Sequence, residues 1–175
     1  DIRSGHFTHY RMEDNNRQTL PSDIVRDIIP YKDLLIVATQ NGVCLFDPDS
    51  GKCRQLFKDS KEGKSIKMVA DILLDSEGTL WIAATGEGVF NYRFDTRKLT
   101  NYRHDSANPN SLSNNNVNNI MQDSQGHLWF STSGSGLDLY HPANNDFENF
   151  DKEKNGLASD CVYETQESAA SGKLL

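Results

Sequence analysis

The sequence has few cysteines, no long apolar run and no concentrated positive charge. Its 175 residues include three cysteines, too few for the disulfide framework of a small secreted domain. Apolar runs such as 34–38 are only as long as a strand, whereas a membrane-spanning helix needs about 20 apolar residues. The net charge is −7. Without a basic cluster the chain is a poor candidate for binding nucleic acid, because phosphate recognition needs clustered Lys and Arg.

Motifs for catalysis and for cofactor or metal binding are also missing. The five histidines do not cluster along the chain, and His6 and His9 would point to opposite faces of an expected strand. There is no Ser-His-Asp arrangement, glycine-rich phosphate loop or Cys-His spacing. We therefore predict no catalytic residue, no metal site and no cofactor. We interpret Cys44 and Cys53 as small core residues in preference to a disulfide.

What the sequence does contain is an internal repeat of about 46 residues. Segments 80–85 and 128–133 both begin with Leu-Trp, and the tryptophans are Trp81 and Trp129. An Asp-Ser-x-Gly turn precedes each Leu-Trp, and a glycine with a short apolar segment follows it. A degenerate copy begins at residue 34, where we place Leu35 in the tryptophan position.

Each repeat contains four short segments that are rich in β-branched and aromatic residues and bounded by Gly, Asp, Asn or Pro. This pattern indicates strands joined by tight turns, and four strands in a repeat of this length form one blade of a β-propeller. The predicted fold class is all-β: a propeller fragment of about three four-stranded antiparallel blades plus one strand of each flanking blade. The expected strands lie near 25–30, 33–38, 42–47 and 53–58, near 68–74, 79–84, 88–93 and 98–103, and near 117–123, 127–132, 136–140 and 147–151.

The blades are expected at 20–65, 66–111 and 112–156. Residues 1–19 would carry the last strand of a preceding blade, at 6–10, and residues 157–175 the first strand of a following blade. A propeller closes with about four to eight blades, so three blades leave a sheet face open at each end. We therefore expect neighbouring blades to cover these faces, and we expect the isolated chain to self-associate.

The repeat also predicts which side chains are buried. We interpret the two tryptophans as core residues in preference to platforms for stacking sugars, because a ligand site rarely recurs in each blade. The residues predicted to be mostly buried are Val25, Ile28, Ile36, Val43, Val69, Ile72, Trp81, Val89, Val117, Ile120, Trp129 and Leu137.

A ligand site would lie on the face that carries the loops between second and third strands and the loops between blades. Polar residues in these loops are the binding candidates, although they are also the types expected in a solvated loop. The candidates are Gln40, Asn41, Glu87, Ser133 and Ser135, with Arg26, Asn116 and Asp160 near the central channel.

The segments Asp-Ser-Glu-Gly-Thr-Leu-Trp-Ile at 75–82 and Asp-Ser-Gln-Gly-His-Leu-Trp-Phe at 123–130, with the linker 104–117, resemble the two-component regulator propeller repeat. The resemblance covers nearly the whole chain, but residues 30–33 replace the turn in the first blade. In that family such propellers form the extracytoplasmic sensor region of hybrid histidine kinases.

The resemblance implies a non-catalytic, periplasmic segment of an inner-membrane protein whose membrane span lies outside this segment. It further implies that the intact ectodomain binds an oligosaccharide derived from a glycan and signals to a histidine kinase. Two alternatives remain open. One is a propeller lyase or glycosidase, and the other is an array of blades with a purely structural role.

Overall fold

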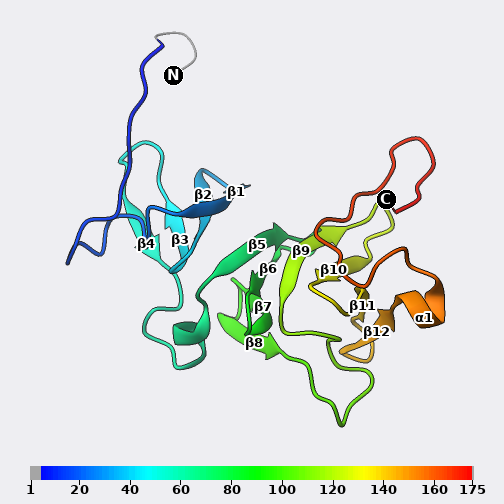
Figure 1. The fold of residues 1–175 in the computed structure, drawn as a ribbon. Helices are drawn as coiled ribbons and strands as arrows, with labels where there is room; N and C mark the ends of the chain where they lie inside the picture. Colours follow the sequence, from blue (N-terminus) through cyan, green and yellow to red (C-terminus); the bar gives the residue numbers. More distant parts are fainter. Residues whose placement is uncertain (1–4, 175) are drawn as a thin grey trace.

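The computed structural model describes residues 5–174, which form three four-stranded antiparallel sheets (Figure 1). In each sheet the strands are paired in chain order, so that each is an up-and-down blade. Blade 1 contains β1 (Val25–Tyr31), β2 (Leu34–Thr39), β3 (Gly42–Phe46) and β4 (Cys53–Gln55). Blade 2 contains β5 (Val69–Leu74), β6 (Thr79–Ala84), β7 (Gly88–Arg93) and β8 (Lys98–Tyr102). Blade 3 contains β9 (Val117–Gln122), β10 (Leu128–Thr132), β11 (Leu137–His141) and β12 (Asp146–Phe150).

The predicted strands are confirmed to within one residue at each end, with one exception. β4 ends at Gln55 and not near residue 58. Phe57 has a φ of 64°, a left-handed conformation that does not continue a strand. Its ring instead packs against Tyr92, with the ring centroids 4.7 Å apart. A short 3₁₀ helix, η1 (Glu62–Ser65), follows in the loop between blades 1 and 2, and α1 (Lys152–Asn155) follows blade 3.

The Asp-Ser-x-Gly turn and the tryptophan form one structural unit. The Asp75 carboxylate accepts hydrogen bonds from the backbone N–H of Thr79 at 2.8 Å and from Nε1 of Trp81 at 2.7 Å. In blade 3, Asp123 accepts the same bond from Nε1 of Trp129 at 3.0 Å. One carboxylate therefore satisfies its own turn and the indole donor, which explains why the two residue types occur six positions apart in the repeat.

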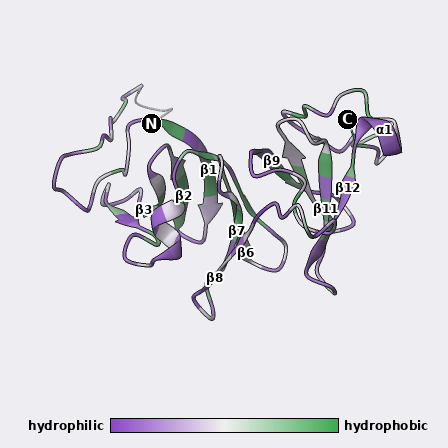
Figure 2. Ribbon diagram, turned by 60° about the horizontal axis from the view of Figure 1, so that its bottom comes forward, coloured by the Kyte–Doolittle hydropathy of each residue, from purple (hydrophilic) through white to green (hydrophobic). Residues whose placement is uncertain are grey.

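The core lies between the blades, where apolar faces of neighbouring sheets meet (Figure 2). Alternation along β6 points Leu80 and Ile82 toward blade 1 and Trp81 toward blade 3. Trp81 is 2 % exposed and contacts the rings of Phe130 and Tyr140 in blade 3 at centroid distances of 5.5 and 5.1 Å. Packing of one blade on the next therefore buries most of the apolar surface.

The burial prediction is wrong at Val25 and Ile28 and only partly met at Trp129, and within residues 5–174 no further blade packs on the faces that carry them. Val25 and Ile28 in β1 are 39 % and 52 % exposed, while Trp129 in β10 is partly exposed. Their repeat equivalents in blade 2 are buried because blades 1 and 3 cover them. The other predicted core positions are buried: Ile36, Val43, Val69, Ile72, Trp81, Val89, Val117, Ile120 and Leu137.

The alignment of blade 1 is also corrected by one residue. Val25 pairs with Thr39 in blade 1, as Val69 pairs with Ala84 in blade 2. Counting back from these pairs places Ile36, and not Leu35, in the position of Trp81. The turn between β2 and β3 is one residue shorter than its counterpart, since Thr39 pairs with Gly42 where Ala84 pairs with Gly88. An alignment of these two glycines therefore misplaces β2 by one residue.

Neither terminal segment forms the strand expected of it. Residues 6–10 are not in a strand, and in 157–174 the pairing consists of isolated bridges. The N-terminal segment nevertheless keeps one contact of the repeat. The rings of Tyr10 and Phe46 meet edge to face at 4.7 Å, as the equivalent Tyr102 and Tyr140 do at 5.7 Å. Tyr10 therefore occupies the place of an outer-strand aromatic without the strand itself.

Candidate functional site

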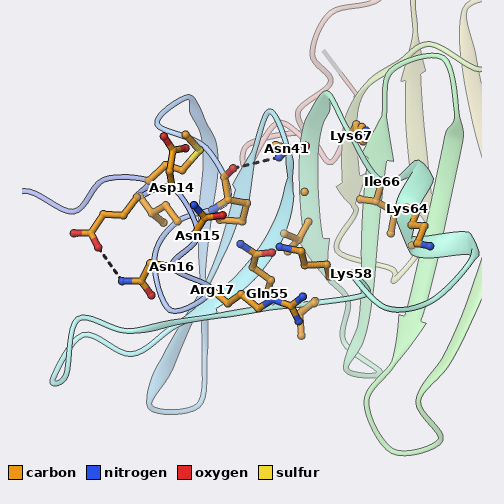
Figure 3. A pocket seen from close by; sticks show the side chains of 18 residues that line it. Asp14, Asn15, Asn16, Arg17, Asn41, Gln55, Lys58, Lys64, Ile66 and Lys67 are labelled. Atoms are coloured by element: carbon orange, nitrogen blue, oxygen red, sulfur yellow. Dashed lines mark hydrogen bonds between the residues drawn. The ribbon is translucent and has the colours of Figure 1, made fainter.

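A pocket of about 660 Å³ opens between the N-terminal segment, the turn after β2 and the loop between blades 1 and 2 (Figure 3). It lies on the face where the sequence predicted ligand contacts, since it includes a turn between second and third strands and a loop between blades. The residues that line it are Met12, Glu13, Asp14, Asn15, Asn16, Arg17, Leu20, Pro21, Asn41, Gly42, Val43, Gln55, Leu56, Lys58, Gly63, Lys64, Ile66 and Lys67.

The N-terminal wall of the pocket is held by hydrogen bonds to blade 1 and within itself. The backbone N–H of Met12 donates to Asp23 Oδ1 at 2.6 Å, and the backbone N–H of Cys53 in β4 donates to the carbonyl of Gln18 at 2.8 Å. Within the wall, Asn16 Nδ2 donates to a carboxylate oxygen of Glu13 at 2.8 Å. The segment is therefore an ordered turn that is joined to the outer strand of the blade.

The opposite wall is the loop from residue 56 to residue 68, which ends on the first strand of blade 2. Ser60 Oγ donates to the carbonyl of Phe57 at 3.0 Å and accepts from the backbone N–H of Gly63 at 2.9 Å. A Cβ at Gly63 would lie 2.2 Å from the carbonyl oxygen of Phe57, so this tight loop requires glycine. The loop thus has a defined shape, and its lysines are exposed.

Ile66 closes the floor of the pocket. It packs with Val43 and Val69, as Leu112 packs with Val89 and Val117 between blades 2 and 3. Leu20 and Val43 complete the apolar floor, and both are buried. Amide side chains and charged groups surround this floor, a combination typical of small-ligand sites.

Among the predicted ligand residues, Asn41 is the one that lines the pocket. Its Nδ2 donates to the carbonyl of Pro21 at 3.4 Å. Gln40 has a different position, since its backbone N–H donates to Ile24 at 2.9 Å and its carbonyl accepts from Met68 at 2.7 Å. Gln40 therefore joins the segments that lead into β1 and β5.

The other candidates lie in the corresponding turns of blades 2 and 3 and near the central channel, outside this pocket. Glu87 forms an ion pair with Arg103, and Ser133 Oγ donates to Asn118 Oδ1 at 2.9 Å. Arg26 is exposed at a β-bulge in β1. The remaining three bond to neighbouring loops: Ser135 with Asn114, Asn116 with Ser133, and Asp160 with Gly134, Gly136 and Lys152.

Two carboxylates away from the pocket join neighbouring elements, the buried Asp138 and the half-buried Asp71. Burial raises the pKa of Asp138 to about 6, although hydrogen bonds from Ser113 and Asn149 act to lower it. Burial likewise raises the pKa of Asp71 to about 6, although its Oδ2 accepts from the backbone N–H of Ile120 at 2.7 Å in the next blade. Asp138 thus links β11 to the loop before β9 and to β12, and Asp71 links blade 2 to blade 3.

The cysteines are free thiols, and two of them are buried. A hydrogen bond with Cys53, together with burial, raises the pKa of the Cys44 thiol. A thiol with a raised pKa is a poor nucleophile, so Cys44 acts as a core residue that packs with Val37 and Phe46.

The basic residues of the pocket were not identified from the sequence. Lys58, Lys64 and Lys67 lie in one loop, and the fold brings Arg17 to the opposite wall. The available signal was the regular spacing of lysines between 58 and 67, in the part of blade 1 where the repeat is least regular. The contribution of Arg17 depends on the path of the N-terminal segment and had no local signal.

No group of three or more His, Cys, Asp or Glu residues within 5–174 is placed to hold a metal ion. In the same range, none of the helices has the length and apolar character needed to cross a membrane.

Residues 111–134 match a family model described as two component regulator propeller. They extend from the linker before β9 through β10, including the turn and Leu-Trp of blade 3. The resemblance identified from the sequence is therefore confirmed in this blade. No curated protein matches the chain significantly.

Solved structures with the same fold come from B. thetaiotaomicron. The chain is 24 % identical to the extracellular domain described as hybrid two component system BT3049, with a TM-score of 0.78 over 95 % of this chain and 24 % of that one. Two structures of the extracellular domain of BT4673, described as a one component and as a hybrid two component system, have TM-scores of 0.70 and 0.69 at 22 % and 20 % identity. Each match covers 93 % of this chain and 21 % of the other.

The chain thus spans about a quarter of the length of the solved domains that it matches. At these identities the likeness establishes the fold. The chain is a β-propeller segment of three blades that carries a two-component regulator propeller repeat.

Proposed function

We propose that this chain is a non-catalytic part of the periplasmic sensor region of a hybrid two-component system, and that the sensor responds to a ligand derived from a glycan. The observation that carries the proposal is the two-component regulator propeller repeat at 111–134, built into blades that match extracellular domains of such systems. In this proposal the histidine kinase and the membrane span belong to the same protein, outside this segment.

The pocket beside blade 1 supports a binding role. Its apolar floor and amide rim suit the alternating apolar and hydroxyl faces of a sugar ring. Each polar contact contributes only about 0.5–1.5 kcal/mol net, so a ligand held by a few loop residues needs further contacts from other blades or domains. We therefore assign binding to the intact ectodomain, with this segment supplying one wall of the site.

The experiment combines calorimetry and chromatography on the intact ectodomain. Titration with a panel of oligosaccharides should reveal saturable binding of at least one, and chromatography of the same mixtures should show that the sugar is recovered unchanged. Release of shorter products would instead support a propeller lyase or glycosidase. An intact ectodomain that binds no oligosaccharide in the panel would support a structural array of blades.

A further inference from the structure

The pocket beside blade 1 concentrates positive charge in an acidic chain. Four cationic side chains line it, against the two carboxylates of Glu13 and Asp14, although the chain as a whole has a net charge of −7. None of the four forms an ion pair with another residue in the described range 5–174. The four are Arg17, Lys58, Lys64 and Lys67.

One of these cations stands where the repeat otherwise has an apolar residue. A leucine lies five positions before the first valine of the inner strand in the other copies, as Leu112 does before Val117. Before Val69 this position is occupied by Lys64, and the apolar contact is made by Ile66 instead. The positive charge therefore belongs to this particular loop and is not a general property of the repeat.

The cations lie on both walls of the pocket. Figure 3 shows Arg17 on the side of the N-terminal segment and Lys64 and Lys67 on the loop before β5, with Gln55 and Lys58 between them. Cations gathered in one cavity repel one another, and an anion bound among them removes that repulsion. Lysine offers a compact charge on a flexible stem, which suits an anionic group of variable orientation.

The neutral part of the lining is suited to the rest of such a ligand. The side-chain amides of Asn15 and Gln55 are not engaged with other described residues, so they are available to sugar hydroxyls. The buried floor of Leu20, Val43 and Ile66 offers an apolar surface for a ring face.

We propose that this pocket binds the anionic group of an acidic saccharide, either a uronate carboxylate or a sulfate ester. The proposal rests on the sensor function above and narrows its ligand class from glycans in general to acidic ones. The lysines supply charge, the amides bind hydroxyl groups, and the pocket contributes one subsite of the larger site in the intact ectodomain.

Nuclear magnetic resonance titration of the 175-residue chain tests this subsite. Sodium galacturonate and galactose 6-sulfate should shift the amide signals of pocket residues with millimolar affinity, and neutral galactose should not. The acid that binds with the higher affinity shows whether the pocket prefers a carboxylate or a sulfate group. The double variant Lys64→Ala/Lys67→Ala should weaken binding about tenfold. The matched control Lys98→Ala/Lys173→Ala removes two exposed lysines outside the pocket and should leave binding unchanged.

Equal shifts with neutral galactose, or equal weakening in the control variant, would overturn the proposal. Calorimetry on the intact ectodomain separates the failure of this inference from the failure of the sensor function. If the ectodomain binds neutral oligosaccharides only, or binds acidic ones equally well in the lysine variant, the subsite is wrong and the sensor stands. If it binds no oligosaccharide at all, the sensor function itself is wrong.

Discussion

Truncation of the two repeat tryptophans should destabilise the protein to different extents, because a neighbouring blade packs on the ring of only one of them, Trp81. Trp81 is 2 % exposed and lies between blades 2 and 3. Trp129 is partly exposed, on the face of blade 3 that is bordered by the segment 161–167 and by no further blade within residues 5–174. Both donate Nε1 to the aspartate of their own turn, at 2.7 and 3.0 Å. The pair therefore isolates the contribution of packing between blades.

The magnitude follows from the area that each ring buries. A tryptophan that buries about 150–250 Å² gains roughly 4–6 kcal/mol at about 25 cal/mol per Å², and a more compact unfolded state reduces this figure. Trp81→Ala should therefore lower the free energy of unfolding by about 3–5 kcal/mol, the range for deletion of a large core side chain. Trp129→Ala should cost at least about 1 kcal/mol less, because no following blade packs on its outer face.

Urea unfolding followed by far-ultraviolet circular dichroism measures both values without relying on tryptophan fluorescence. The two variants should have midpoints in the order Trp81→Ala below Trp129→Ala. Equal losses of stability would refute the argument that the neighbouring blade, and not the turn, accounts for most of the tryptophan's contribution.

Three further predictions follow from single positions. Gly88→Ala should lower the free energy of unfolding by about 3 kcal/mol, because φ is 80° and the new Cβ would lie 2.1 Å from the Tyr102 carbonyl oxygen. Gly78→Ala, where φ is 76° and a Cβ meets no atom within 4 Å, should lower it by only about 1 kcal/mol in the same urea assay. Equal losses in the two variants would contradict this prediction. Burial raises the pKa of Asp138 to about 6, so folding favours its protonated form. The stability of the wild type should therefore fall relative to that of Asp138→Asn as pH rises from about 4 to above 6. Urea unfolding curves recorded across this pH range measure the difference, and a difference that does not change with pH would contradict the prediction. The chain should self-associate through its open faces, and Ile28→Asp on the 52 % exposed position of β1 should lower the mass measured by light scattering; a monomeric wild type at high concentration would disprove this.

Much of the fold was predictable because the same information recurs in each blade. The turn, the Leu-Trp pair and the following glycine locate three strands of a blade within one residue, and Gly88 and Gly136 recur because the backbone of the outer strand passes too close for a Cβ. Two of the errors occur where blade 1 departs from the repeat. A one-residue shorter turn places Ile36 in the tryptophan position, and Phe57 ends β4 early.

The candidate site was less predictable because it is formed where the repeat is broken. Asn41 was accessible to prediction, since its turn recurs in all three blades. Lys64 and Lys67 belong to the loop between blades 1 and 2, whose sequence departs from that of the corresponding loop before β9, and Arg17 reaches the pocket through the fold of the N-terminal segment. Exposure of Ile28 was likewise not predictable from a periodic pattern, because the repeat does not say which sheet face has a neighbouring blade within residues 5–174.

The most direct test of the sensor account is autophosphorylation of the full-length protein in membranes, measured with and without an oligosaccharide that binds its ectodomain. The account predicts that the bound sugar changes the rate of autophosphorylation and is recovered intact. A sugar that binds and leaves the rate unchanged, or that is cleaved while bound, would contradict it.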